Sequence, residues 1–128
     1  MDFSFTEEQE KLRKEIHDYM LERIPADYCI DVSIKGKRLR EWTYKLQKDL
    51  GEKGWLCLGW PKEYGGGGQG HIEVGIVSEE IHMGMPNYVA YHMAAPAVLL
   101  FGTEEQKKKY LPPITRGEYR MDASFYRT

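Results

Sequence analysis

The sequence lacks the features that mark several specialised classes of protein. It has two cysteines, Cys29 and Cys57, which form no C-x-x-C pair, so we expect neither a disulfide framework nor a thiolate metal site. No apolar run approaches the ~20 residues that cross a bilayer. The N-terminus has neither the basic and apolar regions of a secretory signal nor an arginine-rich composition. We therefore expect a soluble, cytoplasmic protein with reduced cysteines and no membrane span.

An excess of positive charge is also missing. The formal net charge is −2, whereas nucleic-acid-binding domains usually carry a clear basic excess. Two short basic segments, residues 35–40 and 107–109, lie beside acidic residues, and we interpret them as solvated surface. The four histidines show no H-E-x-x-H or similar spacing. Neither a nucleic-acid partner nor a metal is expected.

The chain does contain apolar residues at helical spacing. Its 128 residues suit one domain, and apolar positions that recur every three or four residues predict helices. Because the linkers are short and almost no strand is predicted, we expect an all-α fold. It would be an orthogonal or up-down bundle of about five helices, with a glycine-rich loop and a short extended C-terminal tail. The predicted helices cover about residues 7–24, 38–53, 72–83, 87–101 and 104–111.

Two of these helices begin with the same signature. Residues 6–9 and 103–106 both read T-E-E-Q, a capping box in which the threonine hydroxyl accepts from a free amide and the glutamine reaches back. The glutamates also oppose the positive end of the helix. Proline cannot continue a helix easily, so Pro25 is expected to end the first helix and Pro112-Pro113 the fifth.

The fourth predicted helix is apolar or small almost all round, so we expect it to be buried on most sides. Pro96 should kink it or lie where a missing amide is tolerated. Tyr88, Tyr91 and His92 fall at spacings of three and four, which gives one side three polar-tipped rings. A buried histidine needs a partner or lines a cavity. This side of the helix is therefore either a pocket wall or an ordinary packing surface on which the polar ring atoms are hydrogen-bonded, and the pattern alone favours packing.

The segment from 54 to 71 has no helical period. We expect a loop that Trp55 and Trp60 fix onto the core. Its glycines at 65–68 invite comparison with a phosphate-binding loop, but no Lys-Ser/Thr follows and no strand precedes them. A tight turn is the better prediction.

Chemically active groups form no convincing set. Glu79 and Glu80 are adjacent, and neighbouring helical residues point about 100° apart, so the two cannot share a proton; we expect one to cap or bridge and the other to face solvent. His17, His71 and His82 are expected at the surface or satisfied in the core. Because no Ser/His/Asp or Cys/His arrangement can be assembled, the residues alone predict no active site.

Four motifs nevertheless follow one another in a fixed order. In order and spacing they resemble the N-terminal helical domain of the acyl-CoA dehydrogenase family, over about residues 3–118. Each motif alone is moderately specific, whereas the ordered set is strong. The motifs are F-x-x-T-E-E-Q at 3–9, G-W-P-K-E-Y-G-G at 59–66, S-E-E at 78–80 and F-G-T-E-E-Q-K-K-K-Y-L-P-P-I at 101–114.

The resemblance implies an enzyme with a helical domain, a middle β-sheet domain and a C-terminal helical bundle that together bind FAD. In such enzymes a glutamate, usually in the C-terminal bundle, removes the pro-R α-proton of an acyl-CoA thioester. The β-hydride passes to flavin N5 and a trans-2-enoyl-CoA forms. Electrons leave to an electron-transfer flavoprotein, and most members are tetramers.

The resemblance stops after Arg116-Gly117-Glu118. The family continues into a strand and a T-E-P-x-A-G-S-D-like segment that opens the flavin-binding region, whereas this chain reads Y-R-M-D-A-S-F-Y-R-T. We expect residues 1–118 to form the helical domain and 119–128 to begin a strand of a missing β-domain. No catalytic or cofactor-binding residue is assigned, and the chain alone is expected to bind no FAD and to be inactive.

One site is carried over from the family. There, the helix before F-G-T-E-E-Q helps to wall the acyl pocket, which corresponds to Tyr88, Tyr91, His92 and Pro96 in this sequence. Polar rings at these positions predict an acyl group that is bulkier or more polar than a straight fatty chain.

Two functions remain open. The chain is either part of an acyl-CoA dehydrogenase, with acyl-CoA and electron-transfer flavoprotein as implied partners, or a non-catalytic helical module that self-associates or pairs with a chain carrying the missing domains. In both cases apolar surface that faces those domains would be exposed, which predicts a homo-oligomer. The candidates for that surface are Met93, Val98, Phe125 and Tyr126.

Overall fold

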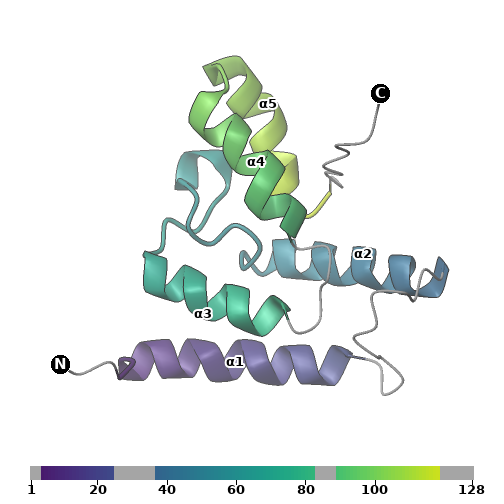
Figure 1. Ribbon diagram of the computed structural model, residues 1–128, viewed down its shortest axis with the longest axis vertical. Helices are drawn as coiled ribbons and strands as arrows, with labels where there is room; N and C mark the ends of the chain where they lie inside the picture. The colour runs from purple at the N-terminus through teal and green to yellow at the C-terminus, as the bar shows by residue number, and fades with distance from the viewer. Residues whose placement is uncertain (1–3, 25–36, 83–88, 119–128) are drawn as a thin grey trace.

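The computed structural model describes residues 4–24, 37–82 and 89–118, without the side chains of 37–40 and 89–94. Every long element in these ranges is a helix, and they contain no strand, which confirms the all-α prediction (Figure 1). The elements are α1 (Glu7–Arg23), α2 (Lys37–Glu52), the short 3-10 helix η1 (Lys62–Tyr64), α3 (His71–His82), α4 (Val89–Phe101) and α5 (Glu104–Thr115). The predicted extended tail at 119–128 lies outside the described residues.

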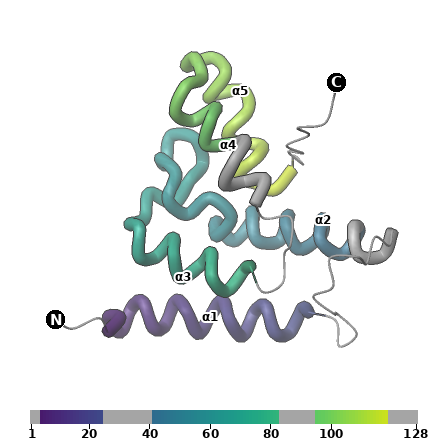
Figure 2. Tube along the Cα trace, in the orientation of Figure 1, coloured from purple at the N-terminus to yellow at the C-terminus, as the bar shows by residue number. Residues whose placement is uncertain are grey.

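The helices form two groups. Helices α1 and α3 lie side by side along most of their length, whereas α4 and α5 form a hairpin whose turn is at the opposite end of the molecule from α1 (Figures 1 and 2). Helix α2 and the loop that carries η1 lie between these groups. The loop packs η1 against α5.

One hydrophobic core joins all five helices, because each contributes a fully buried apolar side chain. The loop after α2 adds three further buried residues, so the prediction that its tryptophan-containing first half is held against the core is confirmed. Ile72, in the first turn of α3, is exposed and does not join this core. The core consists of Ile16, Met20, Leu46, Leu50, Trp55, Leu56, Cys57, Val77, Ile81, Ala95 and Ile114.

Both capping boxes form as predicted. The hydroxyl of Thr6 accepts from the amide of Gln9 at 3.2 Å, and the Gln9 side chain accepts from the Thr6 amide at 3.0 Å. The corresponding distances for Thr103 and Gln106 are 3.2 and 2.9 Å. Because these bonds are local, the sequence alone suffices to place the two helix starts.

The predicted end of α5 at Leu111 is wrong. The helix continues through Pro112 and Pro113 to Thr115. Proline removes an amide donor, but this cost is offset because Leu111, Ile114 and Thr115 are all buried. The freed carbonyls belong to residues on the exposed side of the helix, Lys108 and Lys109, where water can bind them.

Helix α5 ends at a glycine instead of a proline. Gly117 has a φ of 71°, and its amide donates to the Ile114 carbonyl at 2.9 Å. It also lies directly against α2, because a β-carbon at this position would be 2.5 Å from the Gln47 carbonyl oxygen. The Gln47 side chain donates to the Gly117 carbonyl at 3.1 Å. Glycine therefore serves both the turn and the close approach of the two backbones.

The prediction that α4 is buried on most sides is wrong for its last two turns. Ala95 is fully buried, but Ala97, Leu100 and Phe101 are exposed. The helix is apolar in composition, yet only one of its sides meets α5 and the core at this end. Of the residues predicted to form an exposed apolar surface, Val98 is half-buried, and the side chains of Met93, Phe125 and Tyr126 lie outside the described residues.

Candidate functional site

The predicted pocket wall lies on α4. Pro96 falls inside this helix, half-buried, next to the fully buried Ala95. Tyr91 and His92 belong to the same helix, but their side chains lie outside the described residues, as does all of Tyr88. The four residues therefore stay a prediction, with α4 fixed by its packing against α5.

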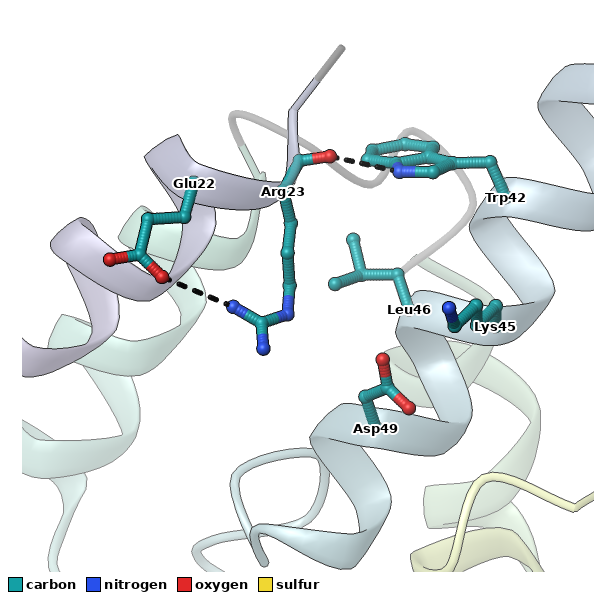
Figure 3. A pocket seen from close by; sticks show the side chains of 6 residues that line it. All are labelled: Glu22, Arg23, Trp42, Lys45, Leu46 and Asp49. Carbon is teal, nitrogen blue, oxygen red and sulfur yellow. Dashed lines mark hydrogen bonds and ion pairs between the residues drawn. The ribbon is translucent and has the colours of Figure 1, made fainter.

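A groove of about 430 Å³ lies between the end of α1 and the middle of α2. None of the predicted site residues lines it. Trp42 closes one side by donating from its indole nitrogen to the carbonyl oxygen of Arg23 at 3.0 Å, and Leu46 contributes an apolar surface (Figure 3). The sequence offered only a faint signal for this groove, a tryptophan near the start of one helix and an arginine at the end of another. Its lining consists of Glu22, Arg23, Trp42, Lys45, Leu46 and Asp49.

Arg23 is the charged residue of this groove that the rest of the protein holds most closely. Arg23 lies 3.7 Å from Glu22, donates to the Tyr19 carbonyl at 3.3 Å and stacks 3.4 Å from the centre of the Tyr19 ring. Burial raises the pKa of Tyr19, and the nearby guanidinium opposes that rise. With two cationic and two anionic side chains, the lining has no clear preference for a charged ligand. The Trp42–Arg23 hydrogen bond joins α1 to α2, and we interpret the groove as structural.

A second polar cluster joins α1 to α3 around Glu80. This carboxylate is 5% exposed; it accepts from Arg13 Nε at 3.2 Å and lies 2.8 Å from His17 Nδ1. Glu79, 64% exposed, lies 3.4 Å from the same arginine. The prediction that one acid bridges and the other faces solvent is correct, but the partners of Glu80 come from a helix more than sixty positions away.

The cluster continues along the two helices at Gln9. Its side-chain nitrogen donates to Glu73 at 2.8 Å while its oxygen caps α1. The hydrogen bond from Gln9 holds the pKa of Glu73 below its ordinary value. The groove does not include any of these residues, and every buried polar side-chain atom in the described part has a partner. We interpret the cluster as structural, with no atom left over for a substrate.

The glycine loop is held by hydrogen bonds between its own backbone groups. The amides of Gly66, Gly67 and Gly68 donate to the carbonyls of Pro61, Cys57 and Trp60 at 3.1, 3.3 and 2.9 Å. A β-carbon at Gly66 would lie 2.2 Å from a backbone oxygen, so the loop is a close backbone contact. Because these amides bond back to the same loop, the segment is a tight turn, as predicted.

The Cys57 thiol is buried in the core. Burial raises the pKa of the Cys57 thiol to about 12, so it carries no nucleophilic thiolate near neutral pH. His71 and His82 are exposed. In the described ranges no three acidic, histidine or cysteine side chains are grouped to bind a metal. No helix there has both the length and the apolar composition to cross a bilayer.

Comparison with known proteins identifies the family to which the chain belongs. Residues 6–118 match the family described as "Acyl-CoA dehydrogenase, N-terminal domain". The chain belongs to the acyl-CoA dehydrogenase family. It corresponds to the helical N-terminal domain, as the resemblance of its four motifs predicted.

Among the relatives, the acyl-CoA dehydrogenase FadE26 of Mycobacterium tuberculosis is 31% identical over 98% of this chain and 32% of its own length. A structure of a "Tcur3481-Tcur3483 steroid ACAD" is 39% identical, with a TM-score of 0.74 over 92% of this chain and 31% of that one. The ChsE4-ChsE5 complex of M. tuberculosis is 31% identical, with a TM-score of 0.73 over 94% and 30%. The chain thus spans about a third of the length of these proteins.

Enzymes of this family depend on FAD. An acyl-CoA dehydrogenase from Bacillus anthracis, solved in complex with FAD, is 28% identical, with a TM-score of 0.67 over 90% of this chain and 20% of that one. In the described residues the glycine loop is closed on itself and every buried polar side-chain atom has a partner, so none of these groups is assigned to the cofactor. Flavin chemistry is therefore not assigned to any residue of this chain.

Proposed function

We propose that the complete protein catalyses FAD-dependent α,β-desaturation of an acyl-CoA thioester, and that this chain supplies one wall of the acyl pocket and surfaces for assembly. The observation that carries the proposal is the family match over residues 6–118, together with a helix arrangement shared with flavoenzymes of the family. The groove between α1 and α2 does not enter the proposal, since its lining carries two cationic and two anionic side chains and favours no charged ligand.

The proposed pocket wall consists of Tyr88, Tyr91, His92 and Pro96, of which the last three belong to α4. Two observations support it: the polar-tipped rings recur at helical spacing, and α4 is anchored by Ala95 in the core and by its packing against α5. An anchored helix can keep a pocket wall in a fixed place. Polar rings on such a wall favour an acyl group that is bulkier or more polar than a straight hydrocarbon chain.

The partners follow from the same family. We propose acyl-CoA as the substrate, an electron-transfer flavoprotein as the electron acceptor, and FAD bound through parts of the enzyme other than these helices. We also propose that the chain assembles with other chains, which the occurrence of a two-protein complex among its solved relatives supports; the homo-oligomer predicted from its sequence is one form that this assembly can take.

A chimaeric enzyme tests the pocket wall. Residues 1–118 would replace the matching segment of FadE26, and activity on straight-chain and on bulky cyclic acyl-CoA thioesters would be measured. We expect an active flavoprotein in which Tyr91→Leu with His92→Leu shifts the preference towards straight chains. Tyr110→Leu, an exposed tyrosine on α5, is the matched control. An unchanged preference would remove the pocket wall from the proposal.

The isolated chain tests whether flavin binding and catalysis require the other parts of the enzyme. Mixed with FAD and passed through a desalting column, it should elute without the visible absorption of flavin and should not desaturate an acyl-CoA. If instead it retained stoichiometric flavin and turned over substrate alone, the alternative of a non-catalytic module would be excluded and so would the proposed role as a wall only.

A further inference from the structure

The turn at residues 116–118, which follows α5, is closed by its own backbone. The amide of Gly117 donates to the Ile114 carbonyl at 2.9 Å. The amide of Glu118 donates to the Pro113 carbonyl at 3.0 Å. Together with the φ of 71° at Gly117, these two bonds make a Schellman motif. The direction of the backbone is therefore fixed as far as Glu118.

Helix α2 holds the same turn from the other side, where the end of α5 reaches it (Figure 1). Tyr44, Gln47 and Gly51 lie at spacings of three and four, so they share one side of α2. The Gln47 side-chain nitrogen donates to the carbonyl oxygen of Gly117 at 3.1 Å, and the Tyr44 hydroxyl donates to the carbonyl oxygen of Glu118 at 3.2 Å. Two successive carbonyls of the turn thus accept from two neighbouring side chains of α2.

Two glycines allow the backbones of α2 and the turn to come this close. A β-carbon at Gly51 would lie 2.4 Å from the carbonyl carbon of Arg116, and one at Gly117 would lie 2.5 Å from the carbonyl oxygen of Gln47. Gln47 is buried, whereas Tyr44 is 47% exposed. Because the contact is backbone against backbone and closely packed, the turn has little room to shift along α2.

The turn is also the last part of the helical domain. The family match ends at residue 118, and the chain spans about a third of the length of its relatives. Helix α5 packs against α4, which carries most of the proposed pocket wall. A shift of the turn would therefore move this wall relative to the segment that follows residue 118. Misplacement of a substrate site by about 1 Å can lower turnover by about a hundredfold.

We propose that Gln47 and Tyr44 are positioning residues, which fix the direction in which the chain leaves the helical domain at Glu118 and so place the pocket wall relative to the flavin-binding parts of the complete enzyme. The effect on catalysis rests on the proposed function, whereas the fixed turn is a property of this chain alone. Gln47 contributes more than Tyr44, because its hydrogen bond is buried and that of Tyr44 is exposed.

Hydrogen exchange of the full chain, followed by NMR, tests the fixed turn. Gln47→Met keeps most of the side-chain volume and removes the donor. The amides of Gly117 and Glu118 should then exchange about five- to tenfold faster relative to the core amide of Leu50. Tyr44→Phe, at an exposed position, should increase the same ratio about two- to threefold. An unchanged ratio in both variants would overturn the proposal.

Gln9→Met is the matched control for these variants. Gln9 also donates to a distant segment, at 2.8 Å to Glu73, but it lies on α1 and joins α1 to α3. Its replacement should speed exchange at the start of α1 and leave the ratio for Gly117 and Glu118 unchanged. An equal rise of that ratio in Gln9→Met and Gln47→Met would show a general loss of stability and would overturn the specific role of Gln47.

The chimaera with FadE26 tests the effect on catalysis. Gln47→Met should lower kcat per bound flavin about fivefold or more, whereas Gln9→Met should leave it unchanged. A loss of stability alone reduces the amount of flavoprotein but not the turnover of each bound flavin, so this quantity separates positioning from stability. Equal kcat per flavin in the two variants would overturn the positioning role.

Two further outcomes are distinguishable. An inactive parent chimaera would overturn the proposed function and with it the catalytic effect, while hydrogen exchange in the chain still decides whether the turn is fixed. If Gln47→Met does not fold, Tyr44→Phe decides both tests: a smaller change in the same direction supports the proposal, and no change overturns it.

Discussion

Replacing Glu80 with glutamine is expected to weaken the attachment of α1 to α3. The Glu80 side chain is 5% exposed and contacts Arg13 at 3.2 Å and His17 at 2.8 Å. Glutamine has nearly the same shape, so the change removes one charge and one acceptor oxygen without leaving a cavity. The effect therefore reports on the polar contacts alone.

The expected loss in free energy of unfolding is about 1–2 kcal/mol. Removing one member of a fully buried ion pair costs about 3–5 kcal/mol, because the other charge is left in a dry interior. Here the side chains of Arg13 and His17 are 36% and 43% exposed, so water can solvate both after the change. The cost should stay nearer that of a lost hydrogen bond to a charged group, about 1.5–3 kcal/mol at most.

Glu79→Gln is the matched control for this measurement. Glu79 also contacts Arg13, at 3.4 Å, but it is 64% exposed, and such surface pairs contribute about 0–1 kcal/mol. Urea denaturation followed by circular dichroism should lower the midpoint for the Glu80 variant with an unchanged slope, and a thermal scan should lower its Tm by about 3–8 °C. Equal midpoints for the two variants would refute the view that burial makes Glu80 the stronger contact.

Three further changes follow from the geometry. Gly117→Ala should destabilise the protein by about 2 kcal/mol or more in urea denaturation, because the added β-carbon would meet a backbone carbonyl of α2 and the residue has a φ of 71°. Gly75→Ala, in α3 with open space around it, should instead stabilise the protein by about 0.5–1 kcal/mol. The reverse order of stability would contradict the close approach at Gly117. The hydrogen bond between Tyr64 and Glu104 raises the pKa of Tyr64 to about 12 and lowers the pKa of Glu104. The stabilisation from this bond is therefore complete between the ordinary pKa values of 4.5 and 10.0, and it is lost as pH falls below or rises above that window. The difference in unfolding midpoint between wild type and Tyr64→Phe should shrink at both extremes of pH, and a constant difference would count against the bond. Cys57, as the sole cysteine of a variant, should react with a disulfide reagent only as fast as the protein unfolds, since burial raises its pKa to about 12; rapid labelling of the folded protein would show that the thiol is accessible.

The sequence predicted those parts of the fold that depend on contacts between near neighbours. Both capping boxes lie where the repeated T-E-E-Q places them, because the threonine and glutamine need only three residues to reach each other. The end of α2 is likewise local, since Gly54 takes the left-handed conformation with a φ of 76°. The family and its helical domain were also readable, because four motifs in order specify far more than each does alone.

For the candidate site, the sequence predicted only which helix carries it. The spacing of the aromatic residues placed the predicted wall on α4, and Pro96 does lie in that helix. The groove between α1 and α2 was missed, because it is formed by residues of two separate helices and no short-range pattern marks it.

Only the tertiary structure decided which of these local preferences prevail. Two prolines should end α5 by local rules, yet Leu111 and Ile114 are buried and keep the helix going. The composition of α4 predicted burial on most sides, yet Leu100 and Phe101 are exposed, because a helix in a hairpin is covered only where a neighbour reaches it. Local hydrogen bonds are fixed by sequence spacing alone, whereas burial depends on which distant segments come to lie alongside, and that is settled only when the whole core is assembled.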